Sequence, residues 1–272
     1  MSAVAVGGER RVRAPLTRRG RIRLGAIAVI AALLLWSAAS LAGVLPANVV
    51  PGPGEVAAAL GGQLVSGGFW ASIGQTLLSV FIGLLIVFVI AAPLSIAMGR
   101  VRFIRESLWG VLEFLKPIPP VALIPLTLLL WGISPTMKLF LVVFGSLWPL
   151  LTQMTYGVRE TDGLALAMAR SYRLGWWRTI RRVIVPSLLP FTATGLRVSA
   201  SIALIISVVT EMITGAAGIG KDITLAQVSG QLPLMYALIV TTGLLGLGLN
   251  VLFRAAERWL LFWHPSQRGE RE

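Results

Sequence analysis

Long apolar runs occur along nearly the whole chain, and they restrict it to folds that are stable inside a lipid bilayer. The hydrocarbon core of a bilayer is about 30 Å thick and takes about 20 helical residues to cross. Backbone amides in that core must bond within the chain, which favours helices. Four runs approach or meet this length: Leu24–Val44, Leu77–Met98, Leu139–Tyr156 and Leu234–Phe253. The sequence therefore predicts an all-α integral membrane protein.

Two less regular runs complete the predicted topology. Ile118–Trp131 is short and rich in proline, and Phe191–Thr214 contains Arg197 and Glu211. Counting both, we predict a polytopic protein with six transmembrane helices. The predicted division of the chain is a basic N-terminal segment, a transmembrane domain and a tail, over residues 1–23, 24–258 and 259–272.

The positions of the basic residues set the predicted orientation. The formal net charge is +13, and clustered basic residues can indicate nucleic-acid binding. Here they gather in alternate loops between the apolar runs, while the other loops hold only Lys138 and Lys221. Basic loops stay on the cytoplasmic side. We therefore predict cytoplasmic termini, a location in the bacterial plasma (inner) membrane, contact with membrane lipid and no nucleic-acid partner.

The longest polar interval of the transmembrane domain, residues 158–190, lies on the predicted cytoplasmic side. We predict a short helix over Leu164–Leu174 and then a second helix. The apolar face of the second helix would consist of Trp177, Ile180 and Ile184. Pro186 and Pro190 are expected to break it before the next span. An interval of this length is where a cytoplasmic partner would bind.

A motif within this interval carries a family resemblance. The run Ala169-Arg170-Ser171-Tyr172-Arg173-Leu174-Gly175 is followed, after nine residues, by Val185-Pro186 and then Leu189-Pro190. It resembles the EAA loop of ABC importer permeases. The glycine at 175 and the proline at 186 match the family pattern, whereas the family's glutamate is an alanine here, Ala167 or Ala169 according to the alignment.

Two further stretches resemble the nitrate, sulfonate and taurine branch of these permeases. One is Lys116–Pro125, and the other is Thr210–Thr214 followed by Gly218-Ile219-Gly220. The resemblance covers about Trp70 to Arg258. It implies the fold of a type I ABC importer permease, which moves a small solute such as nitrate, a sulfonate or taurine into the cytoplasm and is not itself an enzyme.

The resemblance also implies the partners of the chain. A dimer of cytoplasmic ABC ATPases would bind ATP and Mg²⁺, so the permease would bind no cofactor of its own. A second permease copy, as a homodimer, and an external solute-binding protein would complete the importer. The residues implied in coupling to the ATPase are Met168, Ala169, Arg170, Ser171, Tyr172, Gly175, Arg178 and Pro186.

Other patterns that could carry chemistry are incomplete. Gly215–Lys221 matches the first seven positions of a P-loop, but Asp222 stands where Ser or Thr would bind Mg²⁺. This loop also lies on the predicted outer side, so we expect its glycines to form a tight turn. His264 is the only histidine and the chain has no cysteine. We therefore predict no metal site and no catalytic residues.

Glu211 is the one acidic residue inside a predicted span, where a charge is costly. Gly195, Ser199, Ala203 and Ser207 precede it at four-residue spacing, and small residues allow helices to pack closely. We expect Ser207 and Glu211 to face the helix bundle or a dimer partner, where they either support helix packing or line a translocation path.

Two alternatives to the importer stay open at this point. A secondary transporter driven by an ion gradient would place ionisable groups in several spans, and Glu211 and Arg197 are the candidates here. A membrane scaffold would have neither an ATPase partner nor a solute.

Overall fold

The computed structural model describes residues 18–44, 46 and 49–261, which contain helices and no strand. The chain divides into two units, Met1–Val56 and Ala57–Glu272. The first unit contains α1 (Arg18–Leu41) and the start of α2 (Pro53–Leu64). Side chains of α1 from Leu24 to Leu35 are exposed, which suits a helix that presents an apolar surface to lipid.

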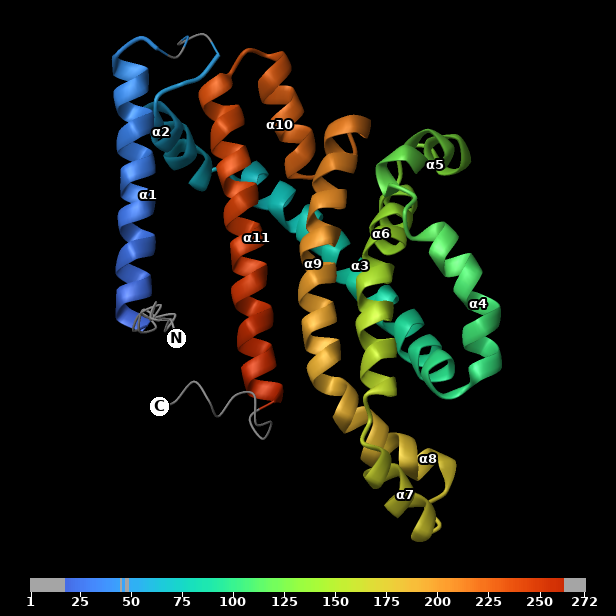
Figure 1. Ribbon diagram of the computed structural model, residues 1–272. Coiled ribbons are helices and arrows are strands. Elements are labelled where there is room, and N and C mark those ends of the chain that lie inside the picture. Colours follow the sequence, from blue (N-terminus) through green and yellow to red (C-terminus); the bar gives the residue numbers. More distant parts are fainter. Residues whose placement is uncertain (1–17, 45, 47–48, 262–272) are drawn as a thin grey trace, which may run out of the picture. The chain divides into compact units, whose positions relative to one another are not determined.

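The second unit contains the remaining helices, with η1 a 3₁₀ turn and η2 a π segment. In chain order they are α3 (Gly67–Arg100), α4 (Arg102–Leu115), η1 (Pro120–Leu123), α5 (Ile124–Trp131), α6 (Pro135–Arg159), α7 (Gly163–Ser171), α8 (Trp176–Thr179), η2 (Ile180–Ile184), α9 (Val185–Thr214), α10 (Ile219–Val228) and α11 (Leu232–Leu260) (Figure 1).

Five stretches of the described chain are long and apolar enough to cross a membrane. They are Arg23–Leu41, Gly67–Arg100, Pro135–Arg159, Trp176–Thr214 and Leu232–Leu260. Four correspond to the clear predicted runs, and Trp176–Thr214 contains the less regular Phe191–Thr214. The all-α, polytopic fold class is therefore confirmed.

The third predicted span, Ile118–Trp131, is not a straight helix. Arg102–Leu115 and Pro120–Trp131 form a pair bent by 80°, because the intervening prolines remove amide donors and disfavour helical geometry in the residues before them. The sixth crossing is present when this bent pair counts as one span, and it then includes α4, which lies between the predicted spans Leu77–Met98 and Ile118–Trp131.

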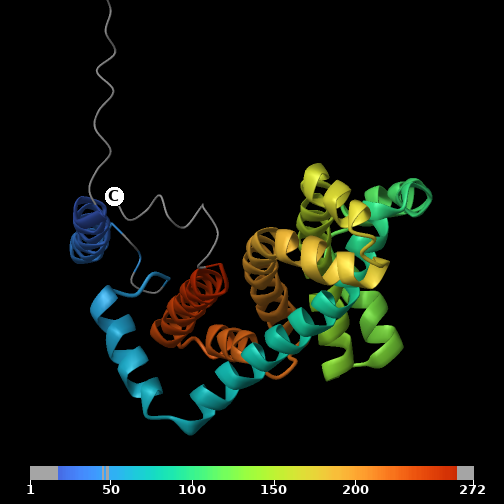
Figure 2. The same ribbon diagram turned by 90° about the horizontal axis from the view of Figure 1, so that it is seen from below.

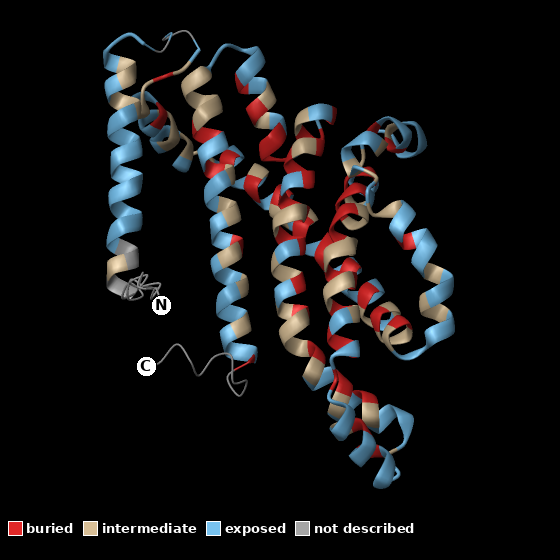
Figure 3. Ribbon diagram, viewed as in Figure 1, coloured by how far each residue is buried: buried red, intermediate tan, exposed pale blue. Residues whose placement is uncertain are grey.

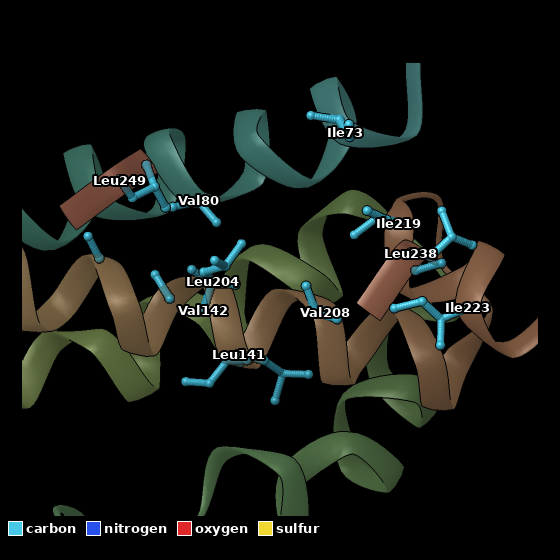
Figure 4. Packing of buried hydrophobic residues seen from close by; sticks show 14 of the residues in the cluster. Ile73, Val80, Leu141, Val142, Leu204, Val208, Ile219, Ile223, Leu238 and Leu249 are labelled. Carbon is cyan, nitrogen blue, oxygen red and sulfur yellow. The ribbon is translucent and has the colours of Figure 1, made fainter. Parts of the chain in front are cut away.

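The core of the second unit lies where α3, α6 and α9 pack together, and Figure 3 shows buried residues concentrated along α6 and α9. Figure 2 shows α3 passing alongside α9 and α10. One apolar cluster includes Val80, Val142 and Leu204, one from each of the three helices (Figure 4). A second cluster, around Leu150 and Met154 of α6, continues toward the cytoplasmic end.

The small-residue stripe of α9 lies inside this packing. Gly195, Ser199, Ala203 and Ser207 are all buried. A Cβ atom on Gly195 would lie 2.9 Å from Cδ1 of Leu150 and 3.3 Å from its Cα atom. Because the Leu150 backbone cannot move aside cheaply, the approach of α9 to α6 depends on the absence of a side chain at position 195.

We expect Gly195→Val to destabilise the purified protein by about 1–3 kcal/mol, because the added methyl groups overpack the contact between α6 and α9. A loss of this size would lower the thermal unfolding midpoint in detergent by about 5 °C. Gly110→Val is the matched control, since position 110 is also within a helix but has no atom within 4 Å of its Cβ position. Equal losses in the two variants would contradict the contact.

Candidate functional site

The segment between α6 and α9, predicted to be cytoplasmic, contains the short helix α7, a tight turn and then α8, which is the first turn of the next helical stretch. Asp162 begins α7 by accepting a hydrogen bond of 2.8 Å from the amide of Leu164. After α7, Arg173 has a φ of 50° and the amide of Leu174 donates to the Ala169 carbonyl at 2.9 Å, which is the pairing of a Schellman C-cap. Figure 1 shows α7 and α8 projecting past the ends of α6 and α9.

Opposite faces of α7 have different surroundings. Leu166 and Ala169 are buried, and Leu166 belongs to the cluster around Met154. Leu164, Met168 and Tyr172, spaced by four residues, are exposed by 63%, 52% and 80%. The helix is therefore anchored on one side and presents apolar side chains on the other, beyond the ends of the membrane-crossing helices.

The residues that the sequence indicated for coupling lie mainly on the exposed surface of this segment. Ala169 is buried at 3% exposure. The exposed members are Met168, Arg170, Ser171, Tyr172, Gly175, Arg178 and Pro186. Of the two alanines that can align with the family's glutamate, Ala167 is exposed and Ala169 faces the interior. A glutamate could reach a partner only from position 167.

The predicted helix break at Pro186 and Pro190 is wrong, because one helical stretch continues from Trp176 to Thr214. The turn before Pro186 is a π turn, in which the amide of Val185 bonds to the carbonyl of Ile180, five residues earlier. In an α-helix, the proline ring would clash with the carbonyl four residues before it. The wider turn allows the chain to remain helical through this site.

The predicted apolar face of the second helix is only partly buried. Ile180 and Ile184 are buried at 6% and 2% exposure, whereas Trp177 is 74% exposed. Trp177 stacks instead on Trp176, with ring centroids 5.9 Å apart and an interplanar angle of 8°. Trp177 lies in α8, before the π segment, at the end of the helical stretch that projects from the bundle.

A second candidate site surrounds Glu211, near the opposite end of α9. Its carboxylate is fully buried and forms an ion pair with Lys138 of α6. Thr76 of α3 donates a hydroxyl hydrogen bond to it at 2.9 Å, Ser207 donates at 3.1 Å and the amide of Gly220 donates at 2.9 Å. Glu211 thus faces the helix bundle, and its side chain connects α9 with α3, α6 and the first turn of α10.

The prediction that Lys138 lies in an outer loop is wrong, because this residue lies inside α6 and is buried at 3% exposure. Its ammonium group also donates to the carbonyl of Ala217 at 3.1 Å. A charge in this position is compensated by Glu211 and cannot be counted with the topogenic charges. The signal for this pair in the sequence was the isolated Glu211. Neither Lys138 nor Thr76 carried a comparable signal.

The loop that resembles a P-loop binds this carboxylate. Gly215 and Gly218 have φ values of 71° and 150°, so the tight turn depends on glycine. A Cβ atom on Gly218 would overlap the Glu211 carboxylate, and one on Gly220 would overlap the Val208 carbonyl. The amide of Gly220 therefore reaches an anion that the chain itself supplies.

The other charged residue predicted within a span is also paired. Arg197 of α9 forms an ion pair with Glu257 of α11, and their side chains are 28% and 16% exposed. The described residues include no group of three His, Asp or Glu that could hold a metal ion. His264 lies outside the described residues.

A cavity of about 430 Å³ lies at the end of the bundle where α10 and α11 meet the start of α3. Its lining comes from residues 63–72 and 222–238. Its polar lining residues are Gln63, Ser66, Ser72, Asp222, Ser229 and Gln231, and its larger apolar ones are Phe69, Leu225, Leu234 and Leu238.

Known transport proteins resemble the chain along most of its length. An aliphatic sulfonates transport permease protein of Escherichia coli, so named provisionally, is 30% identical over 232 residues, covering 85% of this chain and 88% of that protein. The taurine transport system permease protein of the same organism is 26% identical over 255 residues, 92% of each chain. The MetNI methionine ABC transporter, solved in an inward-facing form, shares the fold with a TM-score of 0.62 at 17% identity, covering 70% of this chain and 96% of that one.

The family model of the binding-protein-dependent transport system inner membrane component matches residues 90–261, more than half of the chain. The apolar helices and the projecting cytoplasmic segment agree with that match. The chain therefore belongs to the binding-protein-dependent family of ABC importer permeases, which are inner-membrane transport subunits and not enzymes.

Proposed function

We propose that this permease imports a small sulfonate, and that the surface of α7 and α8 couples it to a separate cytoplasmic ABC ATPase. The observation that carries the coupling proposal is the exposed apolar face formed by Leu164, Met168 and Tyr172. This face lies on the predicted cytoplasmic side. A helix held by Leu166 and Ala169 on one side can dock its other side into a groove as a rigid unit.

The solute proposal rests on the similar proteins, whose names give aliphatic sulfonates and taurine as their cargo. Both cargoes contain a sulfonate group. An external solute-binding protein would deliver the cargo to the outer end of the permease. The cavity between α3, α10 and α11 lies at that end and is our candidate for its contact with the permease. Two permease copies would form the complete pathway.

The pairing of the charges within the spans favours this function over an ion-gradient-driven transporter. A proton relay needs carboxylates that can exchange protons along a path. Glu211 is fully buried and paired with Lys138, and Arg197 is paired with Glu257. These groups support the helix packing, so ATP hydrolysis on the partner remains the proposed energy source.

Gly175 provides a direct test of the coupling surface. Its φ of −59° and ψ of 157° suit any residue, and no atom lies within 4 Å of a Cβ position there. We expect Gly175→Trp to insert and fold normally, while taurine uptake by proteoliposomes with the complete importer falls by about tenfold or more, because the added ring would obstruct docking of the ATPase on this surface. A tenfold change corresponds to about 1.4 kcal/mol.

ATP hydrolysis should continue in the Gly175→Trp importer without driving uptake. Gly110→Trp, exposed on α4 and equally free of neighbours, is the matched control and should transport normally. If the Gly175→Trp importer takes up taurine at the wild-type rate, the coupling surface lies elsewhere. If the wild-type importer couples ATP hydrolysis to uptake of another solute but takes up neither taurine nor alkyl sulfonates, the proposed cargo is wrong and the proposed coupling surface is not affected.

The buried ion pair can be tested with a double-mutant cycle. We expect Lys138→Met and Glu211→Gln each to destabilise the protein by about 3–5 kcal/mol, because each leaves one buried charge without its partner. The double variant should lose less than the sum of the two, since neither charge remains. The free energy of unfolding in detergent is measured for the wild type, the two single variants and the double variant.

Uptake by the double variant separates the two transport mechanisms. We expect a folded double variant to retain ATP-driven uptake that is insensitive to a proton ionophore. A folded double variant without uptake, together with wild-type uptake abolished by the ionophore when ATP is present, would instead support the ion-gradient alternative.

A further inference from the structure

A basic cavity lies at the start of the long helical stretch Trp176–Thr214. Its volume is about 440 Å³ and it is lined by Trp177, Arg178, Arg181 and Arg182. All four residues are exposed. Ile180 and Ile184, on the other side of the same turns, are buried. The helix is therefore fixed by its apolar side, and the three guanidinium groups are available to a ligand.

Among the residues that the structure describes, no acidic side chain pairs with these arginines. Arg178, Arg181 and Arg182 take part in none of the ion pairs of the described chain. The sequence has no acidic residue between Asp162 and Glu211. Three like charges within two helical turns repel one another, so a bound anion would relieve an unfavourable arrangement. This charge pattern indicates an anionic ligand.

The location of the cavity favours one source for that anion. Arg181 and Arg182 are followed at once by the membrane-crossing part of the helix, whose Val185, Val198 and Ile205 are exposed apolar residues. The stacked Trp176–Trp177 pair is exposed at the same junction. Tryptophan concentrates at the level of the lipid headgroups. The arginines thus lie where an apolar helix surface meets the cytoplasmic interface.

We propose that Trp177, Arg178, Arg181 and Arg182 form a binding site for the phosphate headgroup of an anionic phospholipid. Guanidinium groups bind phosphate oxygens through paired, charge-assisted hydrogen bonds. The tryptophan ring would cover the glycerol region, and the acyl chains would follow the exposed apolar residues of α9. Clusters of basic residues at the cytoplasmic end of a membrane helix attract such headgroups.

The test uses the purified full-length chain in detergent, titrated with phosphatidylglycerol or phosphatidylcholine, with bound lipid counted by native mass spectrometry. Arg178 is left intact, because it also belongs to the proposed coupling surface. We expect Arg181→Gln/Arg182→Gln to raise the apparent Kd for phosphatidylglycerol by about tenfold or more and to leave phosphatidylcholine binding unchanged. Arg181→Lys/Arg182→Lys should give an intermediate Kd, since it retains charge without the planar fork.

Arg100→Gln/Arg159→Gln is the control, because it removes two exposed arginines from the ends of α3 and α6. Its Kd should match that of the wild type. Unchanged phosphatidylglycerol binding in Arg181→Gln/Arg182→Gln would overturn the proposal, and so would an equal loss in the control. Displacement of the lipid by inorganic phosphate alone would assign the site to a free anion. Unchanged lipid binding with loss of ATPase co-purification would assign it to the partner protein.

Discussion

The buried charge of Glu211 is the constraint on which the arrangement of this helix bundle depends. A carboxylate without partners would be strongly unfavourable in the membrane interior. The chain compensates for it with Lys138, with the hydroxyls of Thr76 and Ser207, and with the Gly220 amide. Because these donors come from α3, α6, α9 and the first turn of α10, the charge is satisfied only when all four helices are correctly assembled.

This requirement explains a glycine pattern that otherwise suggests nucleotide binding. An N-terminal helix turn with exposed amides is a general anion site, and here the anion is a carboxylate nine residues earlier in the chain. Glycine at 218 and 220 allows the backbone to approach that carboxylate and the preceding helix. The same spacing of a glutamate and two glycines can therefore serve helix packing in a membrane without any phosphate.

The sequence was most informative where one physical signal dominated. Apolar run length identified the membrane helices, and the long polar interval over residues 158–190 identified the segment that projects from the bundle. Prolines were misleading, because the stretch around Pro186 continues as a helix through a π turn, whereas the prolines after α4 do bend the chain. Lys138 was misplaced because its partner, 73 positions away, is brought near only by the packing of α6 on α9. Such pairings depend on tertiary structure, which local patterns do not contain.

One helical stretch, Trp176–Thr214, connects the cytoplasmic segment to the buried charge cluster. At 1.5 Å per residue, its 39 residues extend about 58 Å. The wide turn at Ile180–Ile184 and the proline at 190 are the places where it bends most readily. Beyond them, Gly195 and the residues after it are packed tightly against α6 as far as Glu211. Motion imposed at α8 must therefore either be absorbed at the π turn or move α6 and α9 together. Within the bundle, the close contact at Gly195 favours movement of the two helices together.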